Sequence, residues 1–204
     1  MSSRRILRTS HTLGLTLVAA LALGCSDTPP TAPVSAQSAS ADGARSSVEA
    51  PPPIASEPLT GRHRFTDDVA MQVRVKPDGM PTSTVNLKDA SNIAVVRFTI
   101  QPGVRFPWHS HPGTVLVSVT QGDLVFVYAN DCVRRPYATG TAFVDPGFGN
   151  VHYAYNPTDH ETVIVATFLG VPPAPAPLTN AVDAATSAEL DAKCSVAPAT
   201  AQHH

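Results

Sequence analysis

The sequence predicts an all-β fold, either a β-sandwich or a small β-barrel. Three observations support this. Residues 61–170 contain runs of strand length, the runs are rich in β-branched and aromatic residues, and Gly, Pro or Asn turn signals separate them. Several short strands spaced in this way are typical of sandwiches and small barrels. The runs are MQVRVKP, NIAVVRFTI, TVLVSVT, GDLVFVYAN, GTAFVDPG, VHYAYN and ETVIVATFLG.

Length and composition limit the chain to one compact domain. With 204 residues, 43% of them hydrophobic, it can bury one core. Twenty prolines and only 15% charged residues indicate that part of the chain stays outside that core. The net charge of −2 provides no basic surface for a phosphate backbone, so we expect no nucleic-acid partner.

Residues 1–24 are typical of an export signal, with a basic start, an apolar stretch and small residues before Cys25. The apolar stretch from Thr12 to Gly24 is too short to cross about 30 Å of hydrocarbon. The sequence ALGC, ending at Cys25, resembles the lipobox of bacterial lipoproteins, although that family usually has leucine in place of Ala22. This resemblance implies lipidation of Cys25 and anchoring in a bacterial cell envelope. The alternative is an ordinary secretory signal followed by a spare cysteine.

Residues 25–59 are rich in Pro, Ser and Ala and have almost no bulky apolar side chains. Such a segment cannot offset its conformational entropy by burial, so it is predicted to be a disordered tether. After a lipidated cysteine, a tether of this kind would hold the folded domain away from a membrane surface.

Residues 173–204 form a short C-terminal tail in this interpretation. The sequence VPPAPAP ends the strand region, and TNAVDAATSAELDAKC predicts one short helix capped by Thr179 or Asn180. If Cys25 carries lipid, Cys132 and Cys194 remain as a pair in an exported protein, and we expect them to form a disulfide. Two buried free thiols are the alternative.

His109 and His111 are the first candidate metal ligands, in the segment FPWHSHPG. Side chains two residues apart on a strand project from the same face, so the two imidazoles converge if the segment is extended. An H-x-H pair alone is weak evidence, because two surface or hydrogen-bonded histidines produce the same pattern.

The surrounding residues resemble both conserved motifs of the cupin superfamily. The first, G-x5-H-x-H-x3-E-x6-G, is matched by Gly103, His109, His111 and Gly122, with Val115 in place of the glutamate. The second, G-x5-P-x-G-x2-H-x3-N, is matched with one inserted residue by the positions Gly140, Pro146, Gly149, His152 and Asn156.

The resemblance implies a double-stranded β-helix, or jelly-roll barrel, over residues 60–172, with a metal inside its wide end. The ligands would be His109, His111 and His152. Three neutral histidines leave a divalent ion its full charge and open positions, as in some cupin dioxygenases, so Fe(II) is favoured, with Zn, Mn or Ni as alternatives. Val115 would form an apolar wall, and Trp108 and Phe148 would line the pocket mouth.

Two functions follow from this interpretation. The first is a metal-dependent, dioxygenase-like enzyme acting on a small chelating, anionic ligand. The second is a non-catalytic module that binds a small ligand or the metal itself. Cupins often form homodimers through their sheets, so a homodimer is a further expectation, although the sequence identifies no face for it.

Overall fold

The structure is a computed structural model that describes residues 50–196. The predicted export signal, Cys25 and the tether up to residue 49 lie outside the described residues. Within 50–196 no helix is both long and apolar enough to cross a membrane. The elements are β1 (Ile54–Pro58), β2 (His63–Arg64), β3 (Met71–Val75), β4 (Ser83–Leu87), β5 (Asn92–Ile100), β6 (His109–Ser110), β7 (Thr114–Gln121), β8 (Asp123–Tyr128), β9 (Arg134–Ala138), β10 (Ala142–Asp145), β11 (His152–Tyr155), β12 (Thr162–Leu169), β13 (Asn180–Ala181) and α1 (Ala184–Lys193).

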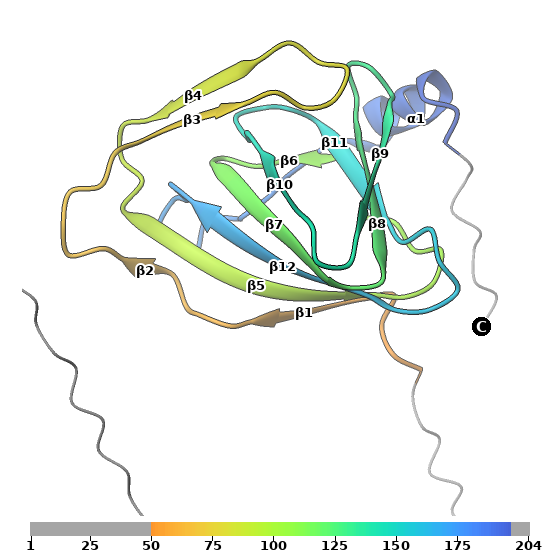
Figure 1. Cartoon of the computed structure of the whole chain (residues 1–204), viewed down its shortest axis with the longest axis horizontal. Coiled ribbons are helices and arrows are strands. Elements are labelled where there is room, and N and C mark those ends of the chain that lie inside the picture. Colours follow the sequence, from red (N-terminus) through yellow and green to blue (C-terminus); the bar gives the residue numbers. More distant parts are fainter. Residues whose placement is uncertain (1–49, 197–204) are drawn as a thin grey trace, which may run out of the picture. The chain divides into compact units, whose positions relative to one another are not determined.

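Two antiparallel sheets form the body of the domain (Figure 1). The larger has the order β1-β5-β12-β7-β10, with β2 also paired to β5, and the smaller has the order β13-β6-β11-β8-β9. Strands β3 and β4 form a separate two-stranded sheet. The predicted all-β jelly-roll fold is therefore confirmed.

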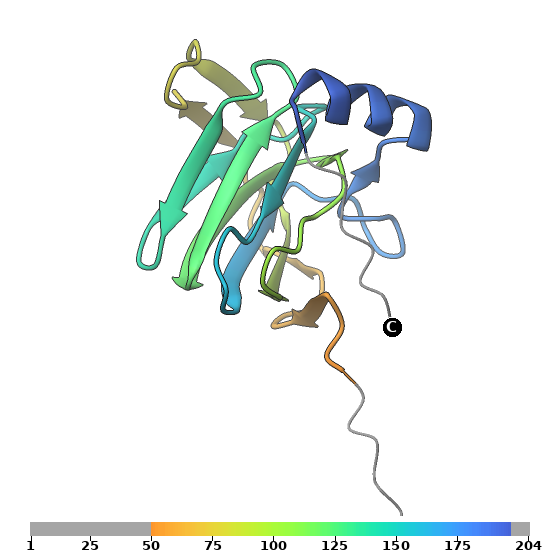
Figure 2. The same cartoon turned by 90° about the vertical axis from the view of Figure 1, so that its right-hand side faces the viewer.

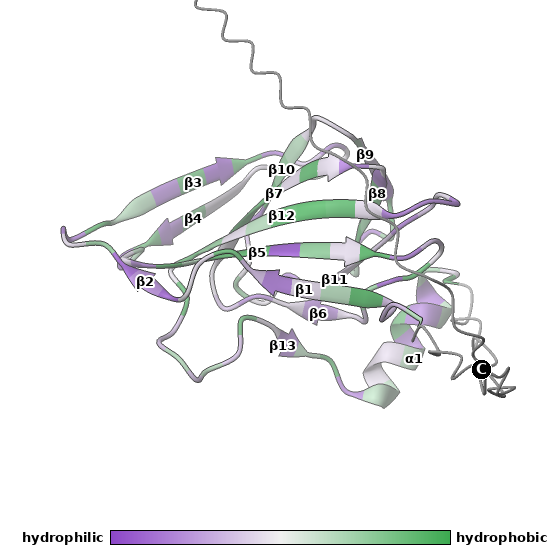
Figure 3. Cartoon of the chain, turned by 90° about the horizontal axis from the view of Figure 1, so that it is seen from below, coloured by the Kyte–Doolittle hydropathy of each residue, from purple (hydrophilic) through white to green (hydrophobic). Residues whose placement is uncertain are grey.

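The main core lies between the two sheets. Its buried side chains include Val96, Val117 and Ile164 from the larger sheet and Leu124 and Ala154 from the smaller one. Strand β12, inside the larger sheet, is hydrophobic over most of its length, whereas β13 at a sheet edge is hydrophilic (Figure 3). This difference follows from burial, because inner strands pack against the core and edge strands meet solvent.

All seven predicted strand runs are strands in the structure: β3, β5, β7, β8, β10, β11 and β12. The predicted end of the tether at Leu59 is wrong, because Ile54–Pro58 forms β1 and pairs along β5 from Ile54↔Ile100 to Pro58↔Val96. The sequence IASEP has too few bulky residues to signal a strand. It is ordered by the backbone hydrogen bonds that the edge of β5 offers and by packing of Ile54 against the main core.

The C-terminal tail packs on the outside of the smaller sheet. Strand β13 pairs with β6, and α1 follows it (Figure 2). The predicted helix is confirmed, but the predicted cap at Thr179 or Asn180 is wrong. Asp183 caps the helix by accepting a hydrogen bond from the Thr186 N–H at 2.9 Å, since Asn180 is already used in the pairing with β6.

The predicted disulfide between Cys132 and Cys194 is present, with the Cα atoms 5.0 Å apart. Cys194 belongs to a second core cluster, outside the barrel, that also contains Trp108, Val127 and Tyr153. Two polar contacts of Asp191 on α1 stabilise this cluster. Asp191 accepts a hydrogen bond from Trp108 Nε1 at 2.7 Å, and it forms a salt bridge with Arg105. The tail is therefore part of the folded domain.

Candidate metal centre

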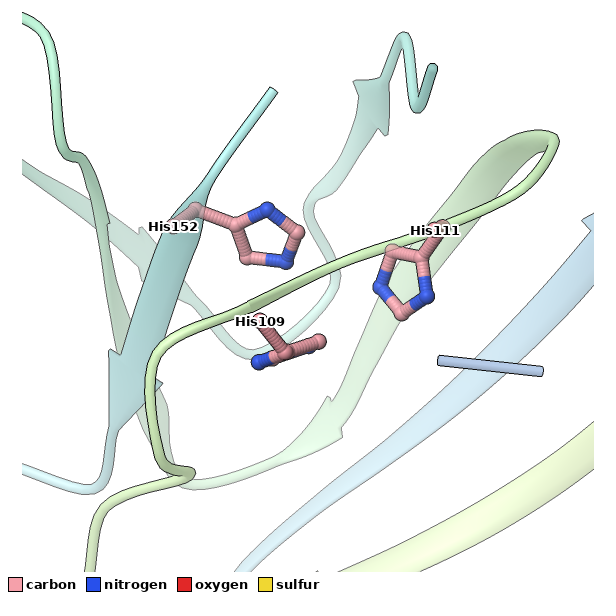
Figure 4. Close-up of side chains that lie close together, drawn as sticks. All are labelled: His109, His111 and His152. Atoms are coloured by element: carbon pink, nitrogen blue, oxygen red, sulfur yellow. The ribbon is translucent and has the colours of Figure 1, made fainter. Parts of the chain in front are cut away.

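The structure brings the three predicted histidines together. His109 lies on β6, His111 follows two residues later, and His152 begins β11. Strands β6 and β11 pair with His109 directly opposite His152. The ring centroids are 4.3 Å apart for His109 and His152, 4.8 Å for His109 and His111, and 5.1 Å for His111 and His152 (Figure 4).

Backbone carbonyls orient all three rings in the same way. Each Nδ1 lies within hydrogen-bonding distance of a backbone carbonyl: His109 with Pro107 at 2.7 Å, His111 with Leu178 at 3.0 Å, and His152 with Asn150 at 2.9 Å. A neutral ring that donates from Nδ1 carries its lone pair on Nε2. The arrangement therefore leaves three Nε2 atoms as acceptors or metal ligands, with partners that hold the rings in place.

Burial keeps these rings neutral. It lowers the pKa of His152 to about 3 and that of His111 to about 4, and the neighbouring histidines lower both further. Burial also lowers the pKa of His109. Neutral imidazole is the form that binds metal ions, so the protein without metal already holds the ligands in the required state.

Aromatic side chains surround the histidines. The Phe126 ring stacks on His152 with centroids 4.6 Å apart, and Phe168 meets His111 edge-on at 5.4 Å. Phe106 lies 6.1 Å from His109. These three rings contribute no hydrogen-bonding groups. The candidate polar partners for a ligand in the site are the histidines, the Tyr128 hydroxyl, whose ring lies 6.4 Å from that of His152, and a carboxylate beside them.

That carboxylate is Asp145, at the end of β10, which the sequence analysis missed. Its side chain is 1% exposed. Oδ1 accepts a hydrogen bond from the Gly147 N–H at 3.0 Å, whereas Oδ2 has no hydrogen-bond partner. Oδ2 lies 3.7 Å from His111 Nε2 and 3.7 Å from His152 Nδ1. Burial raises the pKa of Asp145.

Comparison with known proteins supports the same family. Residues 96–168 match the family described as "Cupin domain", and the matched segment includes all three histidines. Residues 96–168 are therefore similar to a cupin domain. No curated protein sequence matches the chain.

Several solved structures resemble part of this chain. KdgF from Halomonas sp. is 17% identical with a TM-score of 0.40, covering 61% of this chain and 86% of that one. The polyketide cyclase RemF from Streptomyces resistomycificus is 16% identical with a TM-score of 0.39, covering 64% and 80%. A putative sugar phosphate isomerase from Acidithiobacillus ferrooxidans is 22% identical with a TM-score of 0.34, covering 38% of this chain and only 49% of its own length.

The three predicted pocket residues lie in three different environments. Val115 is 2% exposed and belongs to the main core, as do Val117 and Val119 on the same face of β7. The prediction for Trp108 is wrong, because its ring is buried in the outer cluster against Tyr153 and α1. Trp108 immediately precedes His109, the first residue of β6, and successive side chains of an extended chain project from opposite faces. Phe148 has an exposed side chain, and its N–H donates to the His111 carbonyl at 2.9 Å.

A metal ion fits the residues of this site. The three histidines offer ligand atoms that all lie within 4.8 Å of one another, close enough for one ion to hold them after small ring rotations. A buried carboxylate oxygen without a partner faces the same space and lacks a compensating cation. Imidazole donors with a nearby carboxylate suit divalent transition metals.

Metal-free protein is expected to lose stability as the pH falls from about 7 to about 5. The pKa values of folded His111 and His152, about 4 and about 3, lie below the 6.5 of an unfolded histidine, so only the unfolded chain takes up protons in this range. Each ring should lower the free energy of unfolding by on the order of 1–2 kcal/mol. Urea denaturation in the presence of a chelator measures this.

Protonation of Asp145 has the opposite effect on the free energy of unfolding as the pH falls. Its pKa is raised in the folded protein, so the folded state takes up this proton before the unfolded state does and is stabilised by it. The Asp145→Asn variant lacks this contribution, so its stability should fall more steeply over the same pH range. A variant whose stability does not change with pH would contradict the burial of neutral histidines.

Proposed function

We propose that the protein is a metal-dependent oxygenase in which His109, His111 and His152 hold Fe(II) and a small chelating substrate occupies the open positions. The supporting observation is that the three rings offer ligand atoms within 4.8 Å of one another, and that each ring is fixed through Nδ1, which leaves Nε2 available to bind a metal. Bound Fe(II) would supply redox chemistry and a positive charge that binds an anionic or enolate oxygen. The histidines position that charge, and the aromatic walls exclude water.

The charge of the site favours an anionic substrate. Three neutral imidazoles leave a divalent ion its charge of +2, and the nearby Asp145 carboxylate would reduce the total to +1. Both totals are positive. The apolar rings of Phe106, Phe126 and Phe168 exclude water, so that water competes less with an anionic substrate for the ion.

Oxygen consumption tests this proposal. Protein reconstituted with Fe(II) without oxygen is mixed with a β-diketone, a dihydroxybenzoate or a small thiol, and oxygen uptake is recorded. We expect uptake with one of these classes and none with the His109→Ala variant. Full iron occupancy without uptake in any class would overturn the oxygenase proposal.

A second candidate is a non-catalytic module that holds the metal or a small anionic ligand. The rings of Phe106, Phe126 and Phe168 favour it, because they line the site with side chains that can only pack against a ligand. Native mass spectrometry of protein isolated from its own cell envelope distinguishes the two functions. A retained, slowly exchanging small molecule without turnover would support the binding module.

We also propose that the protein is exported and anchored through Cys25. The Cys132–Cys194 disulfide supports export, because disulfides persist mainly in oxidising compartments. The intact mass of the mature protein should show loss of residues 1–24 and addition of lipid at Cys25. A mature chain that retains residues 1–24 would contradict this assignment.

A further inference from the structure

We propose that Asp145 is a fourth protein ligand of the metal, so that the carboxylate of this site comes from β10 and not from β7. This inference rests on the proposed metal site and assigns a residue to it. Oδ2 of Asp145 would bind the same ion as the Nε2 atoms of His109, His111 and His152.

The first argument is that Oδ2 has no other partner. The oxygen is buried without a hydrogen bond, and burying an unpaired charged or polar atom is unfavourable. The rings nearest to it cannot supply a donor, because His111 and His152 are engaged through Nδ1 with backbone carbonyls. Without a cation, the carboxylate would face the lone pair of His111 Nε2 at 3.7 Å.

The second argument comes from the strand register. Asp145 and Val115 are directly paired across β10 and β7. Directly opposite residues of an antiparallel pair project from the same face, with Cβ atoms about 5 Å apart. A carboxylate at position 145 therefore emerges on the same face of the sheet as a side chain at position 115, where the first cupin motif has its glutamate.

The third argument is that the carboxylate is oriented in advance. The Gly147 N–H holds Oδ1, which leaves Oδ2 directed towards the histidines. The turn that supplies this N–H is tightly packed, because Gly147 has a φ of 70° and an added Cβ would lie 2.0 Å from the Gly113 carbonyl oxygen. The distance of 3.7 Å from Oδ2 to His111 Nε2 lies between the roughly 3 Å and 4.2 Å expected for adjacent and opposite ligands of one ion.

The test compares wild-type protein with Asp145→Asn, loaded with Co(II). Asparagine keeps the shape and can still accept the Gly147 hydrogen bond, but it lacks the negative charge. We expect roughly 100-fold weaker Co(II) binding and a changed visible absorption spectrum, because a ligand is lost or exchanged. Asp123→Asn, an exposed aspartate at the start of β8, is the matched control and should change neither.

The possible outcomes distinguish a failure of this inference from a failure of the proposed metal site. Wild-type protein that binds no Co(II) would overturn the metal site itself. Wild-type binding with an unchanged affinity in Asp145→Asn would overturn only the role of Asp145. Weaker binding with an unchanged Co(II) spectrum would also overturn direct coordination, since the carboxylate would then act from outside the ligand shell.

A measurement on the wild-type chain makes the test independent of how the variant folds. With carboxyl-¹³C aspartate incorporated, the infrared difference spectrum on Zn(II) addition should show one carboxylate changing to a metal-bound form. A difference spectrum with no carboxylate change, at full Zn(II) occupancy, would overturn the inference.

Discussion

His152→Ala is expected to lower the bound metal from about one ion per chain to almost none. His152 joins β11 to the site, its ring is fixed between Phe126 and the Asn150 carbonyl, and it is 2% exposed. Its loss leaves His109 and His111 as the only histidine ligands, and metal affinity should fall by at least 100-fold. Elemental analysis after dialysis against the metal measures the change.

His160→Ala is the matched control. It removes an imidazole of the same chain that is 60% exposed and paired only with Asp159. Metal content of this variant should equal that of the wild type. If His152→Ala retained its metal, or if both variants lost it equally, the three-histidine site would be wrong.

Replacing both cysteines, in Cys132→Ser with Cys194→Ser, is expected to lower the free energy of unfolding by about 4 kcal/mol. The disulfide closes a loop with a sequence separation of 62, and without it the unfolded chain gains the conformational freedom of that loop. The disulfide also fixes the end of α1 to the outer cluster. In a domain of this size the melting temperature should fall by about 10 °C.

The metal content of the double variant shows whether its loss of stability is accompanied by damage to the metal site. The disulfide lies in the outer cluster and the histidines face the barrel interior, so the double variant should still bind about one ion per chain. Wild-type protein under reducing conditions should show the same loss of stability. A change below about 1 kcal/mol would contradict the stabilising role of this disulfide.

The strands that the sequence predicted share one property. In β5, β7 and β12, hydrophobic residues repeat along a strand whose inner face packs against the core, and this pattern is visible in the local sequence. Strands β1 and β9 contain proline and polar residues, so no local signal distinguished them from loops. They are strands because an adjacent edge accepts their backbone hydrogen bonds.

The sequence identified the three histidines but not Asp145, for the same reason that it identified some strands and missed others. His109, His111 and His152 stand at spacings that match the cupin motifs, so the sequence could identify them before the strands were placed. Asp145 lies inside the second motif region, immediately before Pro146. One local signal was available, namely a carboxylate at the end of the otherwise apolar run AFVD. Its importance depends on β10 pairing with β7, which the local sequence does not encode.

The sequence by itself determined the all-β class, seven of the strands, the cysteine pair and the three candidate ligands, because these depend on residue types and on patterns within single segments of the chain. Only the tertiary structure placed Trp108 outside the barrel, ordered β1 and directed Asp145 towards the histidines. Each of these depends on which strands pair and in which register, since the register decides the face from which a side chain projects. Register is set by contacts between residues far apart in the chain, such as Val115 and Asp145.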